Sequence, residues 1–159
     1  MFIYLKSLFV VVALCVVLFF ATFSTANDKH SCRSGNDNPI PPAAYANTCG
    51  SCHIAYPAWL LPATSWNKIM SNLGDHFGAE VPVSAEDAAI VESWLKEQAA
   101  GSGASRRGDK VARRLSGQSP LRVTETPWFV HKHRKVRDSK NFADCASCHK
   151  EAAQGIYRD

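Results

Sequence analysis

The 159-residue sequence lacks the features that mark several large classes of protein. No stretch alternates convincingly between polar and apolar residues, which excludes a protein built mainly from β-strands. The longest apolar run, residues 8–21, is shorter than the roughly 20 residues that a membrane-spanning helix needs. Basic residues are neither massed in one stripe nor interleaved with aromatic residues, so the formal net charge of +4 does not indicate nucleic-acid binding. We therefore expect a mostly helical protein with long loops.

The first residues have the pattern of a secretory signal peptide. Residues 2–23 carry a single charge, Lys6, and the small residues at 24–26 precede the polar Asn27. A short basic start, an apolar run and a small-residue end are typical of a peptide that is removed during export. We predict cleavage after Ala26, with a retained membrane anchor as the alternative. Cys15 does not indicate a lipoprotein, because the preceding Leu14 is too large for that cleavage site.

Cysteine occurs six times, but not in the arrangement of a disulfide-stabilised domain. Cys32 lies near the start of the exported part and has no assigned role. Four others form two close pairs, each followed at once by a histidine: Cys49, Cys52 and His53, and then Cys145, Cys148 and His149. Both groups match C-x-x-C-H, the attachment pattern of c-type haem.

This spacing suits the chemistry of haem attachment. Two thiols separated by two residues reach the two vinyl groups at one edge of the porphyrin, and the following histidine binds the iron as an axial ligand. Zinc bound by paired C-x-x-C units is the alternative, whereas a thioredoxin-like redox pair requires a βαβ context that this sequence lacks. We predict two covalently bound haem c groups.

Each haem iron has a sixth coordination position, and its occupant separates an electron carrier from a haem enzyme. A helix predicted over residues 64–77 places Met70 within its apolar stripe, so Met70 is interpreted as core. His76 lies on the flank of the same stripe and is predicted to bind one iron. His30 lies in a polar lead-in and is not predicted to bind iron.

Two histidines compete for the other iron. Thr126 and Pro127 predict the start of a helix that continues to residue 136. His131 and His133 point about 200° apart on such a helix, so one iron can bind only one of them. His133 shares the apolar face and is predicted to be the ligand, with His131 as its rival.

The rest of the chain is predicted to form two small helical lobes, each built around one covalently bound haem. Ser84 and Asp87 resemble a capping box before a helix that ends at Gly101. Other short helices are expected over residues 43–53, 109–115 and 145–153. The predicted order is a signal peptide at 1–26, a disordered lead-in at 27–40, an N-terminal haem lobe at 41–100, a flexible linker at 101–108 and a C-terminal haem lobe at 109–159.

Several ordered segments resemble the bacterial dihaem cytochrome c family. They are NTCGSCHIAYPAWLLPATSW at 47–66, GDHFG at 74–78 and RVTETPWFVHKHRKV at 122–136, followed by the second C-x-x-C-H. The resemblance implies a periplasmic, bis-histidine, low-potential electron carrier whose distal histidines are His76 and His133. His131 departs from the basic residue that is common in the family at that position, and which haem each distal histidine serves stays open. The family is also associated with a membrane-bound b-type cytochrome as electron donor and a small soluble haem protein as acceptor.

The expected function is therefore electron transfer between redox partners and not enzymatic catalysis. The sequence shows no clear catalytic acid/base set, and an iron closed by two histidines leaves no position for a substrate. Methionine ligation would raise the reduction potential, so its absence favours low-potential haems. The alternative is a haem enzyme or gas sensor with one open iron. The basic residues at 106–114 are either a docking surface for an acidic partner or a solvated linker.

Overall fold

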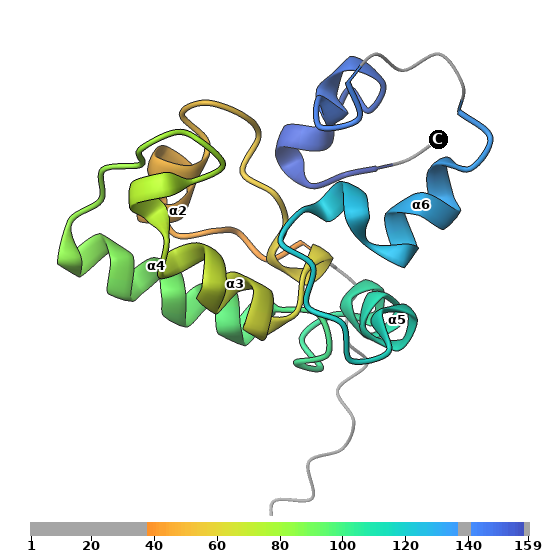
Figure 1. Ribbon diagram of the computed structural model, residues 1–159, viewed down its shortest axis with the longest axis horizontal. Helices are drawn as coiled ribbons and strands as arrows, with labels where there is room; N and C mark the ends of the chain where they lie inside the picture. Colours follow the sequence, from red (N-terminus) through yellow and green to blue (C-terminus); the bar gives the residue numbers. More distant parts are fainter. Residues whose placement is uncertain (1–37, 137–140, 158–159) are drawn as a thin grey trace, which may run out of the picture. The chain divides into compact units, whose positions relative to one another are not determined.

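The computed structural model describes residues 38–136 and 141–157, and Figure 1 shows their helices joined by long loops. No strand occurs among these described residues, so the prediction of a mostly helical fold is confirmed. They all belong to one compact unit, Gly35–Asp159. The predicted signal peptide, Cys15, His30 and Cys32 lie outside the described residues. The part of the chain that is described contains no helix with the length and apolar character needed to cross a membrane.

Short α-helices and 3-10 helices alternate along the chain. The α-helices are α2 (Ala43–Cys49), α3 (Ala63–Met70), α4 (Ala85–Gln98), α5 (Arg106–Leu115) and α6 (Pro127–His133). The 3-10 helices are η1 (Ala58–Leu60), η2 (Leu73–Asp75), η3 (Val123–Glu125), η4 (Cys145–Ser147) and η5 (Ala152–Gln154).

Helix starts agree with the capping residues in the sequence. Ser84 accepts a hydrogen bond from the backbone N–H of Asp87 at 3.0 Å, and α4 begins at the next residue. Thr126 accepts from the N–H of Phe129 at 3.1 Å, and α6 begins at Pro127. Each cap provides an acceptor for an N–H that has no partner within its helix. Both predicted starts are confirmed.

Helix ends agree less well. The helix expected over 43–53 ends at Cys49, and the helix expected over 127–136 ends at His133. In place of a last helix over 145–153, the chain forms two separate 3-10 turns, η4 and η5. Helix α5 begins at Arg106 instead of residue 109, because Ser105 accepts from the N–H of Gly108 and caps it. The last part of the predicted linker is therefore helical, and the division into two lobes stays a prediction.

The helix predicted over 64–77 is wrong beyond Met70. Asn72 donates its side-chain amide to the carbonyl of Asp75, a local bond that competes with helical hydrogen bonding. The chain then reverses in a tight turn, with reciprocal backbone hydrogen bonds between His76 and Ala79. The turn places Phe77 and Gly78 at φ values of 57° and 93°. His76 therefore lies at the base of a turn and not on a helix flank.

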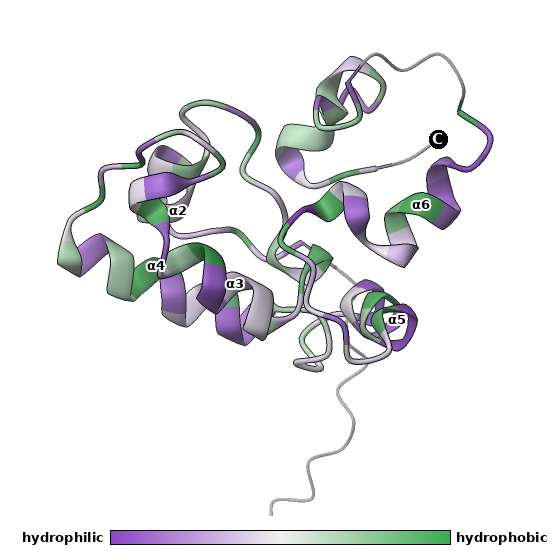
Figure 2. Cartoon of the chain, in the orientation of Figure 1, coloured by the Kyte–Doolittle hydropathy of each residue, from purple (hydrophilic) through white to green (hydrophobic). Residues whose placement is uncertain are grey.

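A single apolar cluster connects the helices. Helix α4 packs against α2 and α3, α5 packs against α6, and η1 contacts both α4 and α5 (Figure 1). Helices such as α4 and α6 carry both apolar and polar residues, as the colouring in Figure 2 shows. The largest fully buried side chains include Leu61, Leu95 and Leu115, and the indole N–H of Trp66 donates to the carbonyl of Ala58 at 2.7 Å. Cys49, the first residue of the first cysteine pair, packs against this cluster.

Candidate functional site

The first cysteine pair lies at the C-terminal end of α2. Cys49 is the last residue of this helix, and the next two residues of the motif form an exposed turn that leads to Cys52 and His53. Gly50 is required at the turn, because a Cβ there would lie only 2.3 Å from the carbonyl oxygen of Ala46. Burial raises the pKa of the Cys49 thiol to about 11. The free side chain of Cys49 is therefore a protonated thiol near neutral pH.

His53 and His76 face one another although they are far apart in the sequence. Their ring centroids are 6.3 Å apart, and their planes differ by 22°. The Nδ1 atom of His53 lies 2.7 Å from the carbonyl oxygen of Ile54. Because a carbonyl only accepts, Nδ1 carries the hydrogen and the Nε2 atom of a neutral ring is free for a metal.

His76 is held by the tight turn that follows η2. Burial lowers the pKa of its imidazole, and the neighbouring His53 and Arg122 lower it further. A lowered pKa favours the neutral ring, which is the form that can donate a lone pair to a metal.

The second cysteine pair has the same arrangement in a different local structure. Cys145 begins η4, and the backbone N–H of His149 donates to the carbonyl of Cys145 at 2.8 Å. The His149 ring lies 6.0 Å from the His133 ring at an interplanar angle of 87°. The Nδ1 atom of His133 lies 3.0 Å from the carbonyl oxygen of Phe129, which again leaves Nε2 free. The Phe129 ring also stacks on that imidazole, with centroids 3.9 Å apart.

The other candidate iron ligands lie elsewhere. His131 is on the same helix as His133, but its side chain is exposed. The adjacent Arg114 lowers the pKa of its imidazole. Met70 is half-buried and packs against the apolar cluster, as its interpretation as a core residue requires.

The distance between the paired rings has a direct chemical meaning. A metal–nitrogen bond of about 2 Å, with about 1 Å more from that nitrogen to its ring centroid, places two imidazoles on opposite sides of one metal about 6 Å apart. The observed distances are 6.3 Å and 6.0 Å. Each pair of rings could therefore hold one iron between them.

A cavity of about 510 Å³ lies between His133 and His149, within the usual range for a ligand pocket. Cys145 and Cys148 belong to its wall, together with apolar side chains and the basic Arg107, Lys110 and Lys132. The hydroxyl of Tyr157, another wall residue, is buried without a hydrogen-bond partner. A buried orphan hydroxyl in an apolar cavity with basic walls fits a large apolar ring that carries carboxylates. These residues fit haem.

The same residues do not fit zinc. Among the described residues, no group of three or more His, Cys, Asp and Glu side chains is close enough together to hold a metal ion. The four cysteines of the two pairs form no disulfide within that part of the chain. Structural zinc needs four such ligands around one ion, so the alternative of a zinc module has no support in the geometry.

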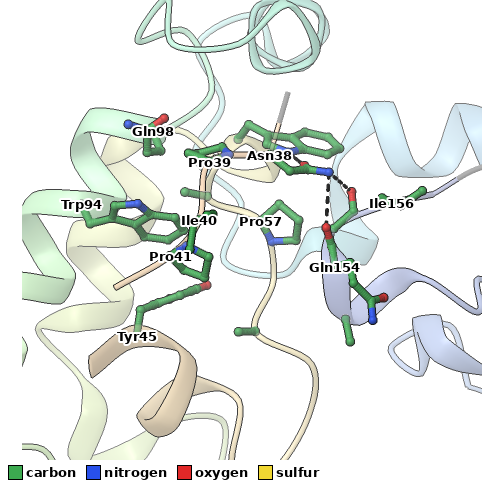
Figure 3. Close-up of a pocket in the computed structure, with 15 residues that line it drawn as sticks. Asn38, Pro39, Ile40, Pro41, Tyr45, Pro57, Trp94, Gln98, Gln154 and Ile156 are labelled. Carbon is green, nitrogen blue, oxygen red and sulfur yellow. Dashed lines mark hydrogen bonds between the residues drawn. The ribbon is translucent and has the colours of Figure 1, made fainter. Parts of the chain in front are cut away.

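A second cavity, of about 380 Å³, contains none of these cysteines or histidines. Its wall includes Trp94 and the prolines near the start of the described chain. Figure 3 shows Asn38 at one side of it, where its side chain donates to the carbonyl of Gly155 at 2.6 Å and to that of Gln154 at 3.5 Å. These bonds attach the start of the described chain to the turn after η5. This cavity is not part of either histidine pair.

Sequence reasoning missed the aromatic residues around the two histidine pairs. Tyr56 packs on His53, and Tyr157 packs edge-on against His149 with centroids 5.4 Å apart. Tyr56 has a weak signal, since it follows His53 by three residues. Tyr157 has none, because the fold of the chain brings it to the cavity. The basic residues Arg107 and Lys110 were noted in the sequence, but not as walls of a cavity.

Comparison with known proteins identifies a family and several similar solved structures. The family described as dihaem cytochrome c matches residues 45–157. A solved dihaem cytochrome c from Rhodobacter sphaeroides is 33% identical with a TM-score of 0.66, covering 74% of this chain and 98% of its own. The protein DHC purified from the same organism is 34% identical with a TM-score of 0.60 and the same coverage. A dihaem cytochrome c from Shewanella baltica is 33% identical with a TM-score of 0.59, covering 75% of this chain and 89% of its own.

No curated protein matches the chain. The family match nevertheless spans most of the sequence and includes both cysteine pairs, and the solved structures agree with it in fold. The predicted family and the predicted haem c groups are therefore confirmed. The chain belongs to the dihaem cytochrome c family, and it carries two covalently bound haem c groups in a mostly helical fold suited to carrying electrons.

Proposed function

We propose that this cytochrome is a low-potential periplasmic electron carrier in which two histidines close each iron. His53 pairs with His76, and His149 pairs with His133. The observation that carries the proposal is the spacing of the two ring pairs, 6.3 Å and 6.0 Å. Haem iron, when bound, alternates between the ferric and ferrous states and so provides one electron at each site.

The protein's part is to hold four imidazoles in the required form and orientation. Backbone carbonyls accept from Nδ1 of His53 and of His133, which would leave the other nitrogen of each ring free to bind iron. Two fixed ligands on each iron leave no position for a substrate or a gas, which supports an electron carrier over an enzyme or sensor. Histidine in place of methionine as the second ligand supports low potentials.

Location and partners are proposed on different grounds. The pattern of residues 1–26 supports export to the periplasm. The resemblance to the family supports a membrane-bound b-type cytochrome as donor and a small soluble haem protein as acceptor. Helix α5 exposes Arg106, Arg113 and Arg114, which would steer the chain toward an acidic partner surface.

Carbon monoxide binding to the ferrous protein tests the closed sites. The native holoprotein is expected to bind none, because carbon monoxide needs an open position on iron. A His76→Ala variant opens one site and is expected to bind one molecule per chain. Met70→Leu, at the rival sulfur ligand, is the control and is expected to bind none. Binding to the native protein would favour a haem enzyme or gas sensor, and reduction midpoints above the standard hydrogen electrode would contradict the low potential.

A further inference from the structure

One side chain contacts both the first histidine pair and the segment that leads to the second cysteine pair. The Tyr56 ring packs on the His53 imidazole with centroids 4.9 Å apart and an interplanar angle of 33°. Its hydroxyl donates to the carbonyl oxygen of Ala143 at 3.0 Å, although 87 positions separate the two residues in sequence. Tyr56 therefore contacts a ligand of the first iron and the segment that carries the second cysteine pair.

The far end of this contact is close to the second haem attachment. Ala143 precedes Cys145 by two residues, and the Sγ atom of Cys145 lies 3.8 Å from the same carbonyl oxygen. A thioether bond joins that sulfur to the porphyrin in a c-type cytochrome. The path from the first haem thus begins with the His53 imidazole and a non-bonded contact to the Tyr56 ring. It continues through one hydrogen bond, two peptide units and the side chain of Cys145.

Tyr56 is also fixed from the core side. Its backbone carbonyl accepts from the hydroxyl of Tyr45, which is buried and packs against Trp94 with centroids 4.6 Å apart. The Tyr56 ring is consequently held between the apolar cluster and the two haem segments. A bridge for electrons requires such a fixed position, since electronic coupling falls exponentially with distance and falls more steeply across a gap than through bonds.

We propose that Tyr56 is the bridge through which the two haem sites exchange electrons. This inference rests on the proposed function. In each exchange one iron loses an electron and becomes ferric, and the other gains it and becomes ferrous. Tyr56 keeps its own electrons and its phenolic proton throughout, so neither an oxidant nor a proton acceptor is needed.

Two substitutions separate the parts of the bridge. Tyr56→Phe keeps the ring on His53 and removes the hydrogen bond to Ala143, whereas Tyr56→Leu removes both contacts. Ser119→Ala is the matched control: the Ser119 hydroxyl makes a 2.7 Å hydrogen bond to Thr64, which also joins distant parts of the chain but involves neither cysteine pair. The rate of electron exchange between the haems is measured by pulse radiolysis of the oxidised holoprotein, after haem content and low-spin spectra are checked.

If Tyr56 is the bridge, the rate of electron exchange between the haems should fall in steps across the two Tyr56 variants. Tyr56→Phe is expected to slow the exchange several-fold and Tyr56→Leu to slow it further, while Ser119→Ala leaves it unchanged. An unchanged rate in Tyr56→Phe would overturn the bridge and leave the proposed function intact. Loss of a haem or of a low-spin signal in Tyr56→Phe would also overturn it, because the residue would then act in holding the haem. Failure of the native protein to accept electrons would instead refute the proposed function.

Discussion

Thr126 holds the helix that carries His133, and its hydroxyl can be tested separately from its methyl group. The side chain is 1% exposed, accepts from the N–H of Phe129 at 3.1 Å and donates to the carbonyl of Val123 at 2.8 Å. Thr126→Val keeps the shape and removes both hydrogen bonds. Thr126→Ser keeps the hydroxyl and removes only the methyl group.

The expected cost follows from these contacts. Loss of an N-cap costs about 1 kcal/mol, and loss of a second buried hydrogen bond costs about 1 kcal/mol more. The carbonyl of Val123 still accepts from the backbone N–H of Thr126, so it is not left without a donor. Thr126→Val should therefore lose about 2 kcal/mol of unfolding free energy, or about 8 °C in melting temperature at about 4 °C per kcal/mol. Thr126→Ser should lose less than about 1 kcal/mol for the methyl group.

Thermal unfolding of the holoprotein, followed by far-ultraviolet circular dichroism, measures this difference. If His133 binds iron as proposed, the low-spin spectrum of that haem should disappear at a lower temperature in Thr126→Val, since α6 carries His133. If Thr126→Val melts at the same temperature as the native protein, or if Thr126→Ser loses more stability than Thr126→Val, the hydroxyl of Thr126 does not stabilise α6.

Three further results are expected. His133→Met should raise the reduction potential of one haem, whereas His131→Met should leave both unchanged in a spectroelectrochemical titration. Burial raises the pKa of Tyr157 above its usual value. The contribution of Tyr157 to stability is therefore complete below about pH 10, the usual pKa of tyrosine, and declines as the pH rises further. The melting temperature should fall above that pH, and it should fall less in Tyr157→Phe. Gly155→Ala should lower the melting temperature more than Gly103→Ala, because both have positive φ but only the Cβ at 155 would come within 2.9 Å of a side-chain carbon.

The attachment residues could be predicted because their chemistry is local. Two thiols and a histidine at fixed spacing indicate c-type haem without any knowledge of the fold. The start of α6 could be predicted for the same reason, since Thr126 and Pro127 act within one turn of helix. The position of His133 one turn after Phe129 predicts that it lies on the inner face of this helix, and its ring does lie beside that of His149.

The prediction of His76 as an iron ligand rests on a helix that does not extend to this residue. The apolar stripe predicts a helix through residue 77, but α3 ends at Met70 and a tight turn presents the histidine. The hydrophobic periodicity of the sequence does not show that the helix ends at Met70. That end depends on side-chain hydrogen bonds and on the positive φ of Phe77, which form only in the folded loop. His76 faces His53 because of this turn, and the sequence pattern does not predict the turn.

Contacts between distant segments could not be predicted at all. The hydrogen bond from Tyr56 to Ala143 forms only when the chain brings the two cysteine pairs together. Nothing in the local sequence of either residue distinguishes this pair. The unpaired hydroxyl of Tyr157 could not be predicted either, because only the folded chain places it in the cavity wall.

Closure of each haem by two histidines can be tested by low-temperature electron paramagnetic resonance of the ferric holoprotein, combined with a haem count. We expect only low-spin signals, which together correspond to two haems per chain. A high-spin signal that corresponds to one haem per chain would instead show an open iron, and the proposed closed sites would be wrong.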